Sequence, residues 1–213
     1  MVTHVIVATV VLVWAVNVNA LTVSTTTLKQ KEFGMAGIDA LMNLVQAVKS
    51  AVGAGTDSPQ QEIIDLLKDK GYSDKAIAGI LGNIELETGG TFDYQQKEKG
   101  EGEGYGLFQF DPGGMLPYYN KYLEESGMSD SVVAQIDFMD KVAKGDITYY
   151  NEKDDKDVPI LGYGNVNKLQ ESFEKDNVGE IAKDFNTIFE KGKMETDYGK
   201  RDELAEKNYS LFF

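Results

Sequence analysis

The sequence predicts a mainly α-helical domain with a small glycine-rich region of loop and weak β structure. Two observations lead to this fold class. Apolar residues recur at helical spacing in several segments after residue 58, and residues that favour helix ends flank them. Residues 89–112 interrupt the helical pattern with many glycines. Hydrophobic residues make up 42% of the 213-residue chain, which is enough to form a core.

Residues 1–28 form a hydrophobic N-terminal segment, in which His4 is the one ionisable side chain before Lys29. Three interpretations remain open. A secretory signal would be cleaved after Val18-Asn19-Ala20, although a basic start is missing. A membrane-spanning helix fits the length of about 20 residues, although two asparagines weaken it. A valine-rich strand packed within a larger assembly fits the β-branched composition.

Residues 29–57 are expected to contain an amphipathic helix followed by a linker. Helical spacing of apolar residues covers residues 35–52. Residues 53–59 carry the glycine, serine and proline typical of a linker. The globular domain is therefore predicted to cover residues 58–213.

The globular domain is predicted to begin with two well-marked helices. Ser58 and Pro59 have the residue types of an N-cap and first helical position, and Gly71 ends this first helix. Ser73 caps a second helix that runs from Asp74 to about Glu87. Further helices are expected over five segments, and a solvated loop over residues 151–158. The five segments are 114–126, 130–144, 165–175, 178–190 and 199–210.

The second helix ends on two glutamates that periodicity does not distinguish. Ile77, Ile80, Leu81 and Ile84 form its apolar stripe. Glu85 and Glu87 fall on opposite flanks of this stripe. A carboxylate at the border between core and solvent is partly desolvated, which raises its pKa and favours the protonated form that a general acid needs. Each glutamate can also be read as an ordinary solvated residue.

The composition excludes several kinds of chemistry. The chain has no cysteine, and its single histidine is His4, far from the globular domain. Cysteine nucleophiles, Ser-His-Asp triads and histidine-bound zinc cannot be assembled there. We predict no metal and no cofactor. The net charge is −14, and the acidic excess lies within residues 59–213, so we also expect no nucleic-acid binding.

Two sequence blocks resemble those of the phage tail lysozyme family, which is related to goose-type lysozymes and soluble lytic transglycosylases. Residues 82–89 read Gly-Asn-Ile-Glu-Leu-Glu-Thr-Gly and resemble the family's Gly-Asn-x-x-x-Glu-Ser-Gly. Residues 104–111 read Gly-Tyr-Gly-Leu-Phe-Gln-Phe-Asp and resemble its Gly-Tyr-Gly-Leu-x-Gln-Trp-Asp. The resemblance implies an α+β lysozyme-like fold and makes Glu87 the catalytic glutamate, whereas Glu85 falls on a variable position.

The same resemblance implies that residues 104–111 line a sugar cleft. Tyr105, Gln109 and Asp111 are then the expected substrate-binding residues, whereas Phe108 and Phe110 are expected to pack in the core. Weaker matches extend over residues 135–139 and 185–205, where Glu190 and Arg201 are expected to be structural partners rather than catalysts.

The reaction type depends on a second carboxylate. Inverting hydrolysis needs one at about 6.5–9.5 Å from the acid, and retaining hydrolysis needs one at about 5–5.5 Å. Glu103 is the first choice because it adjoins the Gly-Tyr-Gly turn. The other candidates in this segment are Asp93, Glu98, Glu101 and Asp111. Without such a partner, Glu87 would act alone and the product would be an anhydro sugar, as in lytic transglycosylases.

The sequence therefore predicts a virion-associated peptidoglycan glycosidase, either a muramidase or a lytic transglycosylase. It would act on the host periplasm or cell wall during phage genome delivery, attached through residues 1–52 to other tail or ejection proteins or to a membrane. The acidic domain gains little from an anionic wall, which favours delivery by a carrier. Two alternatives are a structural or wall-binding tail protein with little activity, and an exported cellular lytic transglycosylase.

Overall fold

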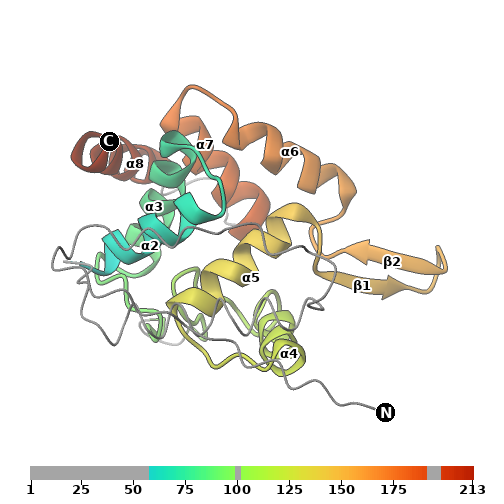
Figure 1. The fold of residues 1–213 in the computed structure, drawn as a ribbon. Helices are drawn as coiled ribbons and strands as arrows, with labels where there is room; N and C mark the ends of the chain where they lie inside the picture. The colour runs from blue at the N-terminus through green and yellow to red at the C-terminus, as the bar shows by residue number, and fades with distance from the viewer. Residues whose placement is uncertain (1–57, 99–101, 191–197) are drawn as a thin grey trace, which may run out of the picture. The chain divides into compact units, whose positions relative to one another are not determined.

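The computed structural model describes residues 58–98, 102–190 and 198–213 (Figure 1). All of them belong to the C-terminal unit of the chain, Thr56–Phe213. The predicted N-terminal hydrophobic segment and the predicted helix over residues 35–52 lie outside the described residues.

The described residues form a mainly helical domain with one small β-hairpin, which confirms the predicted fold class (Figure 1). The helices predicted within residues 58–213 are present, with ends that shift by a few residues, and the one predicted over residues 178–190 is an α-helix followed by a π-helix. The observed elements are α2 (Pro59–Asp69), α3 (Asp74–Glu87), α4 (Leu116–Ser126), α5 (Val132–Lys144), β1 (Thr148–Asn151), β2 (Lys156–Pro159), α6 (Tyr163–Phe173), α7 (Val178–Phe185), the π-helix η1 (Asn186–Glu190) and α8 (Tyr198–Phe212).

The prediction of a solvated loop over residues 151–158 is wrong in part. Strands β1 and β2 pair antiparallel there, with Thr148 opposite Pro159 and Asn151 opposite Lys156. Most of their residues are exposed. Neither face of the hairpin is buried, so no alternation of apolar and polar residues reveals the strands in the sequence. Backbone hydrogen bonds, rather than a buried face, define this element.

The first two helices begin as their sequences predict. Ser58 accepts a hydrogen bond from the backbone of Gln61, and Ser73 accepts one from Ala76. Such caps satisfy amide groups that have no partner within the helix. The predicted apolar stripes of both helices are buried. Helix α3 is buried along most of its length and packs against α7 and α8 (Figure 1).

Two glycines on α3 allow the neighbouring helices to approach closely. A Cβ atom at Gly79 would lie 2.7 Å from a side-chain carbon of Ile181 on α7. A Cβ atom at Gly82 would lie 2.7 Å from the backbone nitrogen of Ala205 on α8. Both contacts are too short for real carbon atoms, so these positions require glycine at the observed helix spacing.

The glycine-rich segment is attached to the helical core by two phenylalanines. Phe108 and Phe110 are buried, which confirms the prediction that they pack in the core. The Phe108 ring lies against Phe189 of η1, and the Phe110 ring lies against Phe138 of α5. The segment has isolated bridges between Lys97 and Tyr105 and between Tyr105 and Phe110, but no extended strand among the described residues.

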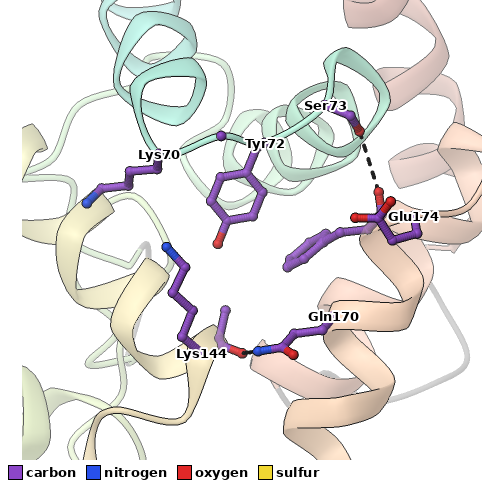
Figure 2. Close-up of a pocket in the computed structure, with 9 residues that line it drawn as sticks. Lys70, Tyr72, Ser73, Lys144, Gln170 and Glu174 are labelled. Atoms are coloured by element: carbon purple, nitrogen blue, oxygen red, sulfur yellow. Dashed lines mark hydrogen bonds between the residues drawn. The ribbon is translucent and has the colours of Figure 1, made fainter.

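A pocket of about 260 Å³ lies between the turn from α2 to α3 and helices α5 and α6 (Figure 2). Lys70, Tyr72, Lys144 and Gln170 are among the residues that line it. The pocket adjoins the start of α3, whereas Glu87 is the last residue of that helix. The length of α3 therefore places the pocket about 20 Å from Glu87. The pocket is therefore distinct from the predicted site.

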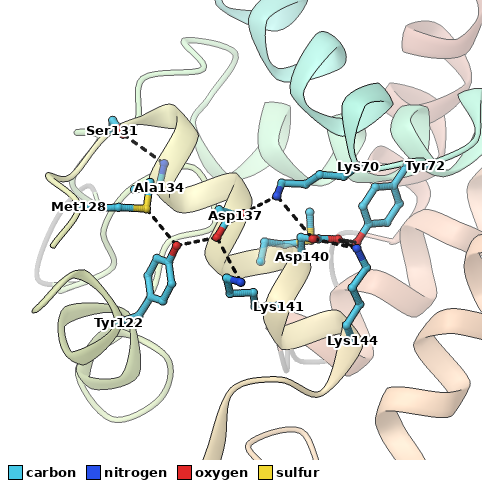
Figure 3. A network of polar contacts seen from close by, with 11 residues as sticks. Lys70, Tyr72, Tyr122, Met128, Ser131, Ala134, Asp137, Asp140, Lys141 and Lys144 are labelled. Atoms are coloured by element: carbon cyan, nitrogen blue, oxygen red, sulfur yellow. Dashed lines mark hydrogen bonds and ion pairs between the residues drawn. The ribbon is translucent and has the colours of Figure 1, made fainter. Parts of the chain in front are cut away.

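The two lysines of the pocket belong to a polar network that joins α2 to α5 (Figure 3). Lys70 donates to Asp137 at 2.5 Å and forms an ion pair with Asp140 at 3.5 Å. Lys144 pairs with Asp140 at 2.8 Å. Tyr122 of α4 donates to the second oxygen of Asp137. The network therefore neutralises both aspartates and ties three helices together.

Replacing Lys70 by methionine is expected to lower the free energy of unfolding at neutral pH by about 2 kcal/mol. Burial opposes ionisation of Asp137, but hydrogen bonds from Lys70 and Tyr122 and the lysine charges outweigh it and lower its pKa below 3.8. This stabilisation is present at pH values above the pKa of Asp137 in the unfolded state. It is lost as the pH falls through the lower pKa of Asp137 in the folded state. Urea unfolding should therefore show a smaller difference between the variant and the wild type at acid pH.

The exposed pair Lys121–Glu125 provides a matched control. Lys121→Met should cost at most about 0.5 kcal/mol, because exposed pairs within one helix contribute little. An effect of Lys70→Met that is independent of pH would contradict the assigned role of Asp137.

Candidate active site

Helix α3 ends at Glu87 because the next residues close it. The hydroxyl of Thr88 donates to the carbonyl of Ile84 at 2.7 Å and accepts from the backbone of Phe92 at 3.1 Å. Gly89 and Gly90 then adopt positive φ angles of 62° and 83°, a conformation that glycine tolerates at no steric cost. Threonine thus provides the hydroxyl at the place where the resembled pattern has serine.

Glu87 forms an ion pair with Arg201 of α8, a residue 114 positions later in the chain. The Glu87 side chain is 22% exposed, whereas the Arg201 side chain is 7% exposed. Arg201 also donates to the side-chain oxygen of Asn83 at 2.7 Å, one turn earlier on α3. Asn83 in turn donates to carbonyls of α3 and α7. The Gly-Asn pair of the first block thus helps to position the arginine.

The same guanidinium pairs with a second carboxylate. Nη1 of Arg201 donates to Glu190, at the end of η1, at 2.9 Å. The Glu190 side chain is 6% exposed. Burial raises the pKa of Glu190, and the charge of Glu87 raises it further, while Arg201 opposes both. Glu190 is thus held closer to its neutral form than an ordinary glutamate.

Glu85 has different partners from those of Glu87. Its carboxylate accepts hydrogen bonds from Lys207 at 2.5 Å and from Asn208 at 2.8 Å. Lys207 is half exposed, whereas the Glu85 side chain is 12% exposed, so Glu85 is mostly covered but its cation reaches solvent. The two glutamates that helical periodicity leaves equivalent are therefore distinguished by their surroundings on α8.

Tyr105 and Gln109, two of the predicted substrate-binding residues, make hydrogen bonds within the protein. The Tyr105 hydroxyl donates to Asp130, which also accepts from Tyr119 and Gln135. The Gln109 amide donates to the backbone carbonyls of Gly106 at 2.8 Å and Gln96 at 3.2 Å. Both side chains remain partly accessible. Their observed contacts hold the glycine-rich segment in place.

The predicted second carboxylates are not joined to Glu87. Glu103 and Asp111 are both exposed, and within the described residues no hydrogen bond or ion pair links either one to Glu87. Asp93 accepts from the backbone of Gln95, and Glu98 accepts from that of Gly104. Glu101 lies outside the described residues.

Helix η1 connects the glycine-rich segment to Glu87 and Glu190, the two glutamates that pair with Arg201. Phe108 of the segment contacts Phe189, with 5.5 Å between ring centres, and Glu190 is the next residue. A π-helical turn is rare and occurs often at functional sites. Glu190 and Arg201 are residues to which the sequence alone assigns only structural roles. The contacts of Glu87 with α8 span more than a hundred residues, so no local pattern reveals them.

Two negative findings apply to the described ranges. No group of three or more acidic or histidine side chains there is placed to hold a metal ion. No helix in these ranges is long and apolar enough to cross a membrane.

A helical domain in which a central helix ends on a glutamate, and which carries a glycine-rich segment anchored by aromatic residues, belongs to the lysozyme-like class. The sequence profile of phage tail lysozymes matches residues 58–212. The chain therefore belongs to the phage tail lysozyme family, as its two sequence blocks predicted. No curated protein gives a significant match to the chain.

Proposed function

We propose that this protein is a peptidoglycan glycosidase in which Glu87 is the general acid. The observation that supports this role most directly is the position of Glu87 at the end of α3. The side chain is partly exposed and reaches a buried arginine. The resemblance of residues 82–89 to the family pattern implies that the catalytic glutamate stands at this position. The absence of cysteine, and of histidine outside the N-terminal segment, leaves carboxylates as the leading acid and base groups.

In the proposed reaction, protonated Glu87 gives its proton to the glycosidic oxygen as the bond from the sugar carbon to that oxygen breaks. Hydrolysis then requires a carboxylate that activates water or forms a covalent intermediate, and Glu103 is the proposed group. If Glu87 acts alone, it takes back a proton from a sugar hydroxyl, which attacks to give an anhydro product. The burial of Glu190 makes it unsuitable for direct contact with substrate.

We further propose that the enzyme is part of a phage particle and opens the host wall locally during genome delivery. Family membership supports the link to a phage tail. The net charge of −14 supports delivery by a carrier, because an acidic domain is not attracted to an anionic wall. Residues 1–52 are the proposed attachment to other tail or ejection proteins or to a membrane.

Analysis of released sugars tests the proposed function. The full-length protein is incubated with purified peptidoglycan, and the soluble fragments are identified by mass spectrometry. We expect muropeptides cut within the glycan strand. Reducing ends would indicate hydrolysis through a second carboxylate, whereas anhydro ends would indicate that Glu87 acts alone. Fragments cut only at peptide bonds would contradict the assignment.

A second candidate function is a wall-binding tail component with little activity. One observation favours it: Tyr105 and Gln109 use their polar atoms to hold their own segment together. In that case the protein would sediment with peptidoglycan without releasing soluble fragments. The same incubation therefore distinguishes the two functions.

A further inference from the structure

Two glutamates form ion pairs with the same arginine, Arg201 of α8, next to the end of α3. Arg201 contacts Glu87 through Nη2 and Glu190 through Nη1. Of the described residues, Arg201 is the one cation that forms an ion pair with either glutamate. If both carboxylates were ionised, the group would carry a net negative charge in a largely buried position. A single added proton makes the group neutral.

The surroundings favour that single proton. Glu190 and Arg201 are 6% and 7% exposed, so an unbalanced charge there is costly. Oε1 of Glu190 is buried and has no hydrogen-bond partner among the described residues. A carboxylate oxygen that is buried in this way disfavours the ionised state. Burial and the Glu87 charge both raise the pKa of Glu190, in agreement with these contacts.

The other charged groups on the surrounding helices interact with different residues. Glu85 of α3 pairs with Lys207, and Asp184 of α7 pairs with Lys175. Burial, the largest effect, and the charge of Glu206 raise the pKa of Asp202 on α8, while the charge of Lys183 on α7 lowers it. These groups do not form ion pairs with Glu87, Glu190 or Arg201 within the described ranges, so the three can be treated as one unit.

We propose that Glu190 is a positioning residue that shares one proton and one arginine with Glu87, and so allows Glu87 to carry the proton that it donates. Burial favours the proton on Glu190, whose Oε1 has no partner among the described residues. In the state in which the proton lies on Glu87 instead, ionised Glu190 balances the charge of Arg201. When Glu87 has given its proton to the glycosidic oxygen, Arg201 stabilises the new carboxylate. This inference rests on the proposed role of Glu87 as the general acid.

The test is the dependence of kcat/KM on pH for the wild type and for Glu190→Gln. Glutamine has the shape of neutral glutamic acid but cannot balance Arg201. Protonation of Glu87 would then leave a buried guanidinium without a counter-ion. We expect the alkaline limb of the profile to move to lower pH by about one unit. Arg201→Gln removes the positive charge and should move the same limb to higher pH.

Glu85→Gln is the matched control, since it removes a nearby carboxylate that pairs with a different cation. Its profile should coincide with that of the wild type. A Glu190→Gln enzyme whose alkaline limb stays in place or moves to higher pH would overturn the proposal, even if its kcat were reduced. Reduced kcat at an unchanged profile is the result expected of a purely structural residue.

A second measurement does not depend on activity or on folding of the Glu190 variant. The free energy of unfolding is measured against pH for the wild type and for Glu87→Gln. Because Glu190 has a raised folded-state pKa, its contribution to stability is lost as the pH rises above about 4.5. Without the Glu87 charge this loss should be smaller.

Equal losses in the two proteins would overturn the shared proton. The absence of wall cleavage by the wild type would instead contradict the proposed function and leave the unfolding result standing.

Discussion

Replacing Glu87 by glutamine is expected to reduce the rate of wall cleavage by about 10²–10⁴-fold, the range typical of a lost general acid. An amide cannot give a proton to the glycosidic oxygen. Glutamine can still accept a hydrogen bond from Arg201, and Glu190 remains to balance the arginine charge. The variant should therefore fold normally and still bind peptidoglycan. The measurement is the initial rate of muropeptide release, compared with binding to sedimented peptidoglycan.

Glu85→Gln serves as the control for this substitution. Glu85 lies two residues away on the same helix, but it contacts the partly exposed Lys207 instead of the buried arginine. Its replacement should change the rate by no more than about twofold. If Glu87→Gln cleaved the wall as fast as Glu85→Gln, the proton donor would have to be another residue.

The sequence predicts the helical framework well because each helix carries its own local signals. The Ser73 cap and the apolar stripe mark the start and the buried face of α3, and the structure confirms both. The hairpin over residues 148–159 lacks such a signal because both of its faces are mostly exposed. Local patterns thus identify elements that bury one face and miss those held by backbone pairing alone.

The site is less predictable from local patterns than the fold. Periodicity leaves Glu85 and Glu87 equivalent, and only the resemblance to a family favours Glu87. The contacts that distinguish them come from α8, more than a hundred residues further along the chain. The same reason applies to Tyr105, whose partner Asp130 lies in a different segment. Residue types suggest what a side chain can do, whereas tertiary contacts determine what it is bound to.

Replacing Gly82 by alanine is expected to destabilise the domain and to disturb the site together. The new Cβ atom would lie 2.7 Å from the nitrogen and 2.9 Å from the Cα of Ala205, and 2.9 Å from the carbonyl oxygen of Arg201. All three are backbone atoms of α8, so no side-chain rotation relieves the clash. Such overpacking costs about 1–3 kcal/mol. The higher helix propensity of alanine offsets about 0.5–1 kcal/mol of this.

The Gly82→Ala variant should also lose activity, because the displaced segment of α8 carries Arg201. A misplacement of about 1 Å can reduce a rate by about 100-fold. Urea unfolding and muropeptide release measured on the same preparation would show both effects. Gly164→Ala is the matched control, since Gly164 lies in α6 and a Cβ atom added there would have no heavy atom within 4 Å outside its own helical turn.

The Gly164→Ala control should be as stable as the wild type, or more stable by up to about 1 kcal/mol, because alanine favours the helix. Equal stability of Gly82→Ala and Gly164→Ala would mean that α8 can move away from α3 at little cost. The contact between Arg201 and Glu87 would then not depend on the spacing of the two helices. A selective loss in Gly82→Ala would instead show that this glycine, on the same helix as Glu87, fixes the distance across which the arginine reaches the proposed acid.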